Sequence, residues 1–236
     1  EHFCSKGSHQ DIRKDTNMDI STEKIAEMVK RALLEMNGTT NTAKVNKGGI
    51  PIGISNRHIH LSQADLETLF GAGYQLTPIK DLSQPGQFAC KETLTIVGPS
   101  LRPIEGVRVL GPVRKASQVE ISRTNSFTLK VKPPVRESGD IAGSAPITII
   151  GPKGTVTLKE GCIIANRHIH MSDEEGKAFG LNDGDYVTVE VNGERRTTFY
   201  DVQVRVNKAF RLEMHIDTDD ANAAGIGNGA KVKIVR

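Results

Sequence analysis

The sequence predicts a mainly β protein made of two similar domains, and three observations support this prediction. Short segments that alternate in polarity or are rich in β-branched residues recur from residue 50 onward at roughly ten-residue intervals, a spacing typical of antiparallel barrels or sandwiches. The 23 glycines and 10 prolines favour many turns and short elements over long helices. The pentapeptide Asn-Arg-His-Ile-His occurs twice, at residues 56–60 and 166–170, which indicates an internal duplication.

The composition excludes several classes of protein. With 236 residues, the chain can bury one large core or two cores of about 100 residues each. A net charge of +3 is too small to indicate a nucleic-acid-binding protein. Three widely spaced cysteines argue against a disulfide framework, and we find neither a membrane-spanning apolar run nor a secretory signal. We therefore expect a soluble protein of the reducing cytoplasm that binds neither nucleic acid nor membrane.

The first part of the chain is expected to lie outside the β domains. Residues 1–18 show no periodicity and are expected to be disordered, with Met18 a candidate start of the native chain. Residues 19–36 predict an amphipathic helix, and residues 37–49 predict a polar, glycine-rich flexible linker. A tethered helix favours binding to an external groove or partner, although docking onto its own core is the alternative. The apolar stripe of this helix consists of Ile25, Met28, Val29, Ala32, Leu33 and Met36.

The strand signals divide into two domains, expected at residues 50–138 and 139–236. A turn-rich stretch that begins at Pro133 marks the join. Asn192 and Gly193 predict a type I′ hairpin turn between two strands. The segments with strand character are 93–98, 106–111, 118–122, 127–132, 147–151, 155–159, 186–191, 201–206, 211–216 and 231–235.

The repeated pentapeptide predicts a metal site. In a strand, residues two apart project from the same face, so His58 and His60 project together, as do His168 and His170. Two imidazoles about 6–7 Å apart along one strand face can converge on one ion. A single His-x-His is weak support for this interpretation, but both copies match at the polar positions while the next apolar residue varies.

A helix start follows each copy of the pentapeptide. Ser62 with Asp65, and Ser172 with Glu175, have the spacing of a capping motif. Each histidine strand is therefore expected to lead to a helix N-terminus, where free N–H groups favour an anion.

Each ion needs a third ligand, and two strand residues are the candidates. His215 is the remaining histidine of the β region, and Glu120 is a carboxylate in a strand context. The alternatives are a solvated strand glutamate and a hydrogen-bonded core histidine. The expected sets are His58, His60 and Glu120 on one ion and His168, His170 and His215 on the other. Three protein ligands per ion are typical of a catalytic site rather than a structural one.

Several motifs closely resemble those of phosphate propanoyltransferases of the propanediol-utilisation type. They are the doubled pentapeptide, the Leu/Met-Ser after each copy, GPVRKASQVEIS at 111–122 and HIDTDDANAAGI at 215–226. The resemblance covers about residues 50–236. It implies two β-barrel domains with short capping helices, a two-zinc site between them with the ligand sets above, and phosphate handling by Arg114. It also implies interconversion of acyl-CoA plus phosphate with acyl-phosphate plus CoA, with propionyl-CoA or acetyl-CoA as the substrate, and a homo-oligomer.

The resemblance extends to location and partners. Residues 19–36 are similar to the encapsulation peptides that draw enzymes of propanediol degradation into bacterial microcompartments. It implies binding to shell or cargo proteins and residence in the microcompartment lumen. For coenzyme A, Arg108 is a candidate for the phosphates, Phe127 for stacking on adenine, and Asn222 for a hydrogen bond. Their alternatives are a strand charge, a core aromatic side chain and a helix cap.

The proposed chemistry has two rivals. The hypothesis is that one zinc polarises the thioester carbonyl, while the second zinc and Arg114 hold the phosphate that attacks it. One rival is a two-metal hydrolase that acts on a thioester or a phosphoester. The other is a non-catalytic, zinc-stabilised assembly module. Cys90 and Cys162 lack the setting of acyl carriers, and the sequence has no phosphate loop of the G-x-x-x-x-G-K-[ST] type.

Overall fold

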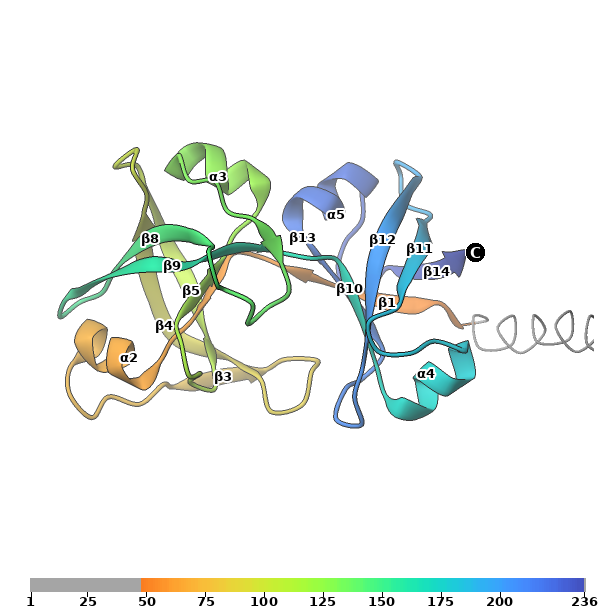
Figure 1. Ribbon diagram of the computed structural model, residues 1–236, viewed down its shortest axis with the longest axis horizontal. Helices are drawn as coiled ribbons and strands as arrows, with labels where there is room; N and C mark the ends of the chain where they lie inside the picture. Colours follow the sequence, from red (N-terminus) through yellow and green to blue (C-terminus); the bar gives the residue numbers. More distant parts are fainter. Residues whose placement is uncertain (1–47, 236) are drawn as a thin grey trace, which may run out of the picture. The chain divides into compact units, whose positions relative to one another are not determined.

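The computed structural model describes residues 48–235 (Figure 1). The predicted disordered segment at 1–18, the predicted helix at 19–36 and nearly all of the predicted linker at 37–49 lie outside these residues. Within the described range, none of the helices is long and apolar enough to cross a membrane.

The first barrel closes from six strands and carries two short additions. Hydrogen bonding runs from β4 through β5, β2, β6, β9 and β8 back to β4. Ile59, Val109 and Ile163 are fully buried inside it. The strands are β2 (His58–His60), β4 (Phe88–Val97), β5 (Pro103–Gly111), β6 (Gln118–Glu120), β8 (Ala145–Ile150) and β9 (Thr155–Ala165), with β3 (Pro78–Asp81) added at β4 and β7 (Val135–Arg136) added at β9.

The second barrel also closes from six strands, in the order β1, β13, β10, β12, β11 and β14. Ile169, Val204 and Met214 are fully buried in its core. The predicted mainly β fold with two barrels is therefore confirmed. The strands are β1 (Ile50–Ser55), β10 (His168–Met171), β11 (Tyr186–Val191), β12 (Thr197–Val206), β13 (Glu213–Asp217) and β14 (Lys231–Val235).

The two barrels exchange strands at the repeated pentapeptide. β1 belongs to the second barrel, but the chain then continues directly into β2 of the first; β9 of the first barrel likewise continues into β10 of the second (Figure 1). The division expected between residues 138 and 139 therefore does not coincide with the barrels, because β8 and β9 complete the first one. The physical reason is burial, since Ile50 and Ile52 of β1 pack in the second core.

Four short helices flank the strands in the described range. In each half of the chain, one helix directly follows the histidine strand and a second helix comes later. Ser62 and Ser172 cap the helices that follow the pentapeptides, and each serine side chain accepts a hydrogen bond from the backbone N–H three residues on. Both predicted helix starts are therefore present. The helices are α2 (Gln63–Phe70), α3 (Arg123–Leu129), α4 (Asp173–Phe179) and α5 (Thr218–Ala224).

One predicted strand is wrong. Residues 127–132 alternate in polarity, but residues 123–129 form α3. Ser122 caps this helix by accepting a hydrogen bond from the Asn125 N–H, and Leu129 is buried while Phe127 is 68% exposed. The cap starts a helix, so the alternation of 127–132 does not become the two faces of a strand.

Candidate active site

Strand pairing brings together the side chains of each expected metal set. β2 and β6 are antiparallel and place Glu120 opposite His58. β10 and β13 place His215 opposite His168 in the same way. Within each set, one potential ligand atom from each of the three residues lies within 4.8 Å of the others. We call His58, His60 and Glu120 the first ligand group, and His168, His170 and His215 the second ligand group.

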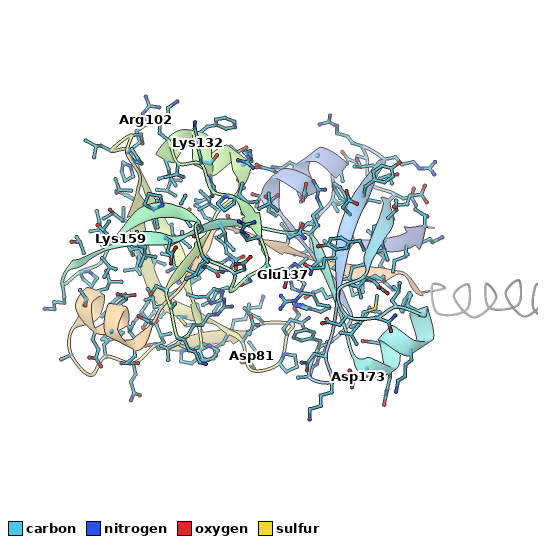
Figure 2. The ribbon with its side chains drawn as sticks, in the orientation of Figure 1. Asp81, Arg102, Lys132, Glu137, Lys159 and Asp173 are labelled. Carbon is cyan, nitrogen blue, oxygen red and sulfur yellow. The ribbon has the colours of Figure 1, made fainter. Side chains whose placement is uncertain are left out.

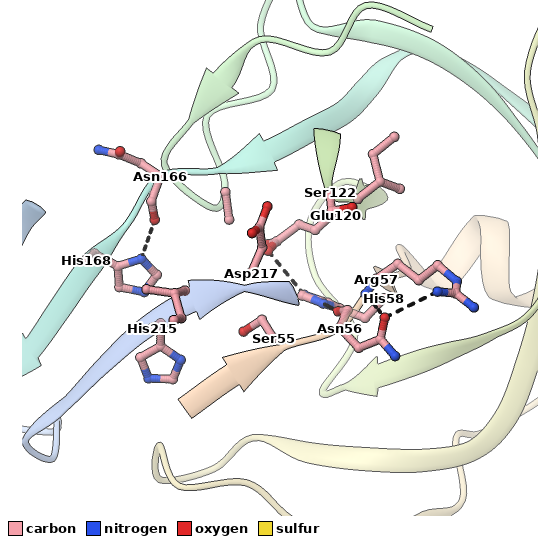
Figure 3. Close-up of a pocket in the computed structure, with 13 residues that line it drawn as sticks. Ser55, Asn56, Arg57, His58, Glu120, Ser122, Asn166, His168, His215 and Asp217 are labelled. Atoms are coloured by element: carbon pink, nitrogen blue, oxygen red, sulfur yellow. Dashed lines mark hydrogen bonds and ion pairs between the residues drawn. The ribbon is translucent and has the colours of Figure 1, made fainter. Parts of the chain in front are cut away.

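Hydrogen bonds orient the first histidine of each pair in the same way. The Nδ1–H of His58 donates to the backbone carbonyl of Asn56, and the Nδ1–H of His168 donates to that of Asn166; both distances are 2.8 Å. A carbonyl only accepts, so these contacts fix the proton on Nδ1 and leave Nε2 with a free lone pair. Figure 3 shows the contact between His168 and the Asn166 carbonyl as a dashed line.

The second histidine of each pair has an unsatisfied nitrogen. The Nδ1 atoms of His60 and His170 are buried and have no hydrogen-bond partner among the described residues. Buried polar atoms normally have partners, because leaving one unpaired costs about 1–3 kcal/mol. A free nitrogen lone pair close to other atoms that can bind a metal is the arrangement expected of a metal ligand. The residues present therefore fit an ion in each group.

The electrostatics of the first ligand group keep Glu120 ionised and His60 neutral, and they favour a proton on His58. Burial lowers the pKa of His60 to about 3, and the charges of His58 and Arg114 add to this effect. Burial alone would lower the pKa of His58 too, but the Glu120 carboxylate, 3.3 Å from its Nε2, raises the pKa above the ordinary value. The pKa of Glu120 is lowered despite burial because His58 stabilises its charge.

In the second ligand group, burial keeps the imidazoles neutral. It lowers the pKa of His168 to about 4, with a further contribution from His215. Burial lowers the pKa of His170 to about 2, followed by the effects of His168 and His215. Neutral imidazole is the form that binds a metal, so both rings are in the binding form at neutral pH.

A polar network fixes the third ligand of the first group. Glu120 Oε1 accepts hydrogen bonds from Gln118 Nε2 at 2.6 Å and from Ser138 Oγ at 2.7 Å. Ser138 Oγ in turn accepts from Arg114 Nη1 at 3.0 Å. The guanidinium predicted to handle phosphate is therefore connected through one hydroxyl to a predicted metal ligand.

A matching arrangement surrounds the third ligand of the second group, with one residue from the other barrel. Glu213 Oε2 lies 3.0 Å from His215 Nε2 and accepts a hydrogen bond from the Ser83 hydroxyl. Ser83 belongs to the loop of residues 82–87, which joins β3 to β4 and which we call the strap. A Cβ on Gly53 would lie 2.9 Å from Glu213 Cδ, so the carboxylate fits here because residue 53 is glycine.

Both ligand groups face one cleft of about 660 Å³. Its lining comes from both barrels and includes, beyond the ligand groups, Lys80, the strap residues Ser83 and Gln84, Arg108, Arg114, Ser138, Arg205, Phe210 and Glu213. A second cavity, of about 30 Å³, lies where the two chain crossings meet and has room for about two water molecules (Figure 3). The crossings supply its Asn56, Arg57 and Asn166. Glu137 of the first barrel, labelled in Figure 2, accepts a hydrogen bond from Gln203 of the second barrel.

The structure brings some of the predicted coenzyme A residues to the cleft but not all of them. Arg108 lines the cleft, where its Nη1 donates to the carbonyls of Cys90 and Lys91. Phe127 and Asn222 are exposed on α3 and α5 and line neither described cavity. The exposure of Phe127 excludes the core alternative, and the N-cap of α5 is Asp217 rather than Asn222.

The sequence did not single out four residues that shape the site: Ser83, Ser138, Arg205 and Glu213. Glu213 had a usable signal, because it alternates with His215 on the same strand face. Gln118 stands in the same relation to Glu120. Ser83 and Ser138 lie in loops, and only the folded structure brings these loops close to the ligand groups.

Comparisons with known proteins point to one family. A family model described as phosphate propanoyltransferase matches residues 51–227. A phosphate propanoyltransferase of Lachnoclostridium phytofermentans is 56% identical over 218 residues, covering 92% of this chain and 99% of the relative. One of Thermotoga maritima is 58% identical over 188 residues, covering 79% and 89%. One of Listeria monocytogenes is 44% identical over 220 residues, covering 93% and 97%.

Proposed function

Because this chain belongs to the phosphate propanoyltransferase family, we propose that it transfers a short acyl group between coenzyme A and inorganic phosphate. The proposed substrates are propionyl-CoA or acetyl-CoA with phosphate, and the products are the acyl-phosphate and CoA. The observation that carries this proposal is the shared cleft, in which two three-residue ligand groups and Arg114 meet. Two anionic substrates repel each other, and a cleft that concentrates positive charge offsets that repulsion.

The two ligand groups would hold two divalent ions, and we propose zinc. A set of two imidazoles and a carboxylate, and a set of three imidazoles, both suit zinc and also accept cobalt. When bound, the ions supply Lewis-acid stabilisation of negative charge on substrate oxygen atoms. Asn56 and Asn166 hold the imidazoles of His58 and His168 in the tautomer that leaves Nε2 free.

Arg114 is the proposed phosphate-binding residue. Its backbone N–H donates to the Leu61 carbonyl at 2.8 Å, and its Nη1 donates to Ser138, so both the backbone and the guanidinium are held. A guanidinium has five N–H donors, and those not used by Ser138 can bind two phosphate oxygens side by side.

The reaction needs no acyl-enzyme. One phosphate oxygen forms a bond to the thioester carbonyl carbon, the carbon–sulfur bond breaks, and the electron pair leaves with the CoA sulfur, which takes up the phosphate proton. The described cysteines do not fit a carrier role. Both are fully buried, and burial raises the pKa of Cys90 to about 11 and that of Cys162 to about 12.

The test is CoA release from propionyl-CoA by the zinc-loaded protein, with and without phosphate. We expect release that depends on phosphate and yields propionyl-phosphate. Equal release without phosphate would show a thioester hydrolase instead. His58→Ala and His168→Ala should each abolish turnover, since each removes one ligand from a different group; normal turnover by either variant would contradict the metal assignment.

We also propose that the enzyme is a homo-oligomer and that Arg108, Phe127 and Asn222 contact coenzyme A. A separate proposal concerns location: residues 19–36 direct the enzyme to the microcompartment lumen by binding shell or cargo proteins. The amphipathic pattern of residues 19–36 supports the targeting role. A fluorescent protein fused behind residues 1–49 should co-localise with microcompartment shells. A matched fusion with Leu33→Lys, which breaks the apolar stripe, should remain dispersed.

A further inference from the structure

Among the arginines that line the cleft in the described part of the chain, one has a side chain without a hydrogen-bond or ion-pair partner. Arg57 donates a hydrogen bond to Asn56. Of the acids that line the cleft, Glu120 contacts His58, Glu213 contacts His215, and Asp81 forms no ion pair with a described residue. Arg108 is bound to backbone carbonyls and Arg114 to Ser138. Arg205 lines the same cleft, and in the part of the chain that the structure describes its side chain forms neither a hydrogen bond nor an ion pair.

The fold places Arg205 beside the second ligand group. It lies on β12 directly opposite His170 of β10. Its guanidinium carbon is 5.8 Å from the centre of the Phe210 ring, and that ring packs 4.2 Å from the centre of the His170 ring. The Phe210 ring is therefore close to both the Arg205 guanidinium and the His170 imidazole, and all three residues line the cleft.

Arg205 of the second barrel and Arg114 of the first line the same cleft. Burial lowers the pKa of Arg114, Glu120 opposes this shift, and the positive charge of Arg205 adds to it. Two guanidiniums that repel each other in a partly buried cleft are unfavourable unless an anion lies between them.

We propose that Arg205 is a second phosphoryl-binding residue, which together with Arg114 binds one phosphoryl dianion across the two barrels. This inference rests on the proposed acyl transfer and assigns the phosphate subsite to residues of both halves. The ligand chemistry is a phosphoryl group, which inorganic phosphate, an acyl-phosphate and coenzyme A all carry. The position of Arg205 opposite a predicted metal ligand favours the phosphate that reacts.

The experiment uses the full chain, loaded with zinc, and the variant Arg205→Gln. We expect the KM for phosphate to rise roughly 10- to 100-fold, because one charge-assisted contact is lost. The KM for propionyl-CoA should change less than about twofold. A larger change in the KM for propionyl-CoA than for phosphate would assign Arg205 to the phosphates of coenzyme A and overturn the proposal, and so would two unchanged KM values.

Two further variants control for folding and for charge. Arg196→Gln removes an exposed arginine that pairs with Glu190 near the other end of β12, and it should leave both KM values unchanged. Arg205→Lys keeps the charge but loses the planar donor pair, so its KM for phosphate should lie between those of the wild type and Arg205→Gln. A lysine variant with the wild-type KM for phosphate would contradict the proposed contact, even if the glutamine variant fails to fold.

A binding measurement separates this inference from the proposed function. Calorimetric titration of the zinc-loaded protein with inorganic phosphate needs no turnover, and Arg205→Gln should weaken the phosphate Kd by the same factor. Wild-type CoA release that does not depend on phosphate would sink the acyltransferase proposal alone. Phosphate-dependent release with an unchanged phosphate Kd in Arg205→Gln would sink the Arg205 assignment alone.

Discussion

Matching positions of the two repeats carry different side chains, and this makes the ligand groups chemically distinct. In the first repeat Glu120 lies opposite His58, whereas in the second repeat His215 lies opposite His168. The first group therefore includes a negative charge, whereas the second consists of three imidazoles. Because a carboxylate neutralises part of an ion's charge, we expect the two sites to differ in affinity and in electrophilicity.

The first prediction at this scale concerns pH and the metal-free protein. Burial first, and then neighbouring charge, lowers the pKa of His60 to about 3 and that of His168 to about 4. An unfolded histidine takes up its proton near pH 6.5, so between about pH 6.5 and 4 the unfolded state binds more protons. The free energy of unfolding should therefore fall as the pH falls through this window.

Urea unfolding in the presence of a chelator, repeated between pH 7 and pH 4.5, measures this effect. His58 acts in another window, because its pKa is raised above 6.5 and its stabilisation is lost only as the pH rises through that higher value. The variant His168→Asn should show a shallower fall. A free energy of unfolding that rises on acidification below pH 6.5 would refute the prediction.

The second prediction concerns Gly53. An alanine there would bring its Cβ to 2.9 Å from Glu213 Cδ and push the carboxylate away from His215. We expect Gly53→Ala to weaken zinc binding at the second ligand group about 10- to 100-fold, as the loss of a supporting hydrogen bond to a ligand does. Competition with a chelator measures it. Gly227→Ala is the matched control, because a Cβ there meets nothing within 4 Å.

At the scale of elements, the strap connects the first barrel to the second ligand group. Gln84 is 3% exposed, its Nε2 donates to the Arg211 carbonyl at 3.0 Å, and its Oε1 accepts from the Arg211 N–H at 3.2 Å. One residue along, Ser83 donates to Glu213. The amide of Gln84 thus mimics a neighbouring strand and holds the strap beside β13.

The third prediction is that Gln84→Ala lowers the free energy of unfolding by about 1–3 kcal/mol, because the backbone groups of Arg211 lose their partners. Zinc affinity at the second ligand group should fall as well, since Ser83 is no longer held. Denaturant unfolding and chelator competition give the two readouts. Gln87→Ala, whose side chain forms no hydrogen bond among the described residues, should match the wild type.

Local patterns predicted most elements, and their failures have identifiable causes. The capped helices after Ser62 and Ser172 were predictable because the cap lies in the same few residues as the helix. Asn192 and Gly193 predicted a two-residue turn, but β11 ends at residue 191 and β12 begins at 197. Gly193 has another role, since a Cβ there would lie 2.2 Å from the Ala224 carbonyl oxygen. That approach of α5 is tertiary and leaves no local pattern.

In the site, too, local patterns could be predicted from the sequence and tertiary contacts could not. His58, His60, His168 and His170 could be found because the repeat and the two-residue strand period are local. Arg205 could not be found in this way, because its proposed role depends on sharing a cleft with Arg114 of the other barrel, and only the fold creates that cleft. Identical pentapeptides also hide different roles. Arg167 forms two hydrogen bonds with Asp220, at 2.8 and 2.9 Å. Among the described residues, the Arg57 side chain donates a hydrogen bond only to Asn56.

At the scale of the whole molecule, strand exchange joins the barrels, and this gives the fourth prediction. A chain of residues 139–236 lacks β1, which lies between β13 and β14, so both of those edges would be unpaired. We expect this fragment alone to show no cooperative unfolding and to bind zinc weakly. The full chain should unfold in a single transition by circular dichroism and by tyrosine fluorescence. Two separate transitions would contradict the coupling.

The exchange also constrains how such a chain can have arisen. A single repeat, ending its first strand at the pentapeptide, closes its own barrel only by borrowing that strand from a second copy. Its expected stable form is a strand-swapped homodimer, with two identical ion sites related by a twofold axis. Fusion of two copies into one polypeptide would allow the two sites to differ, as they do here, with a carboxylate in one group and a third imidazole in the other.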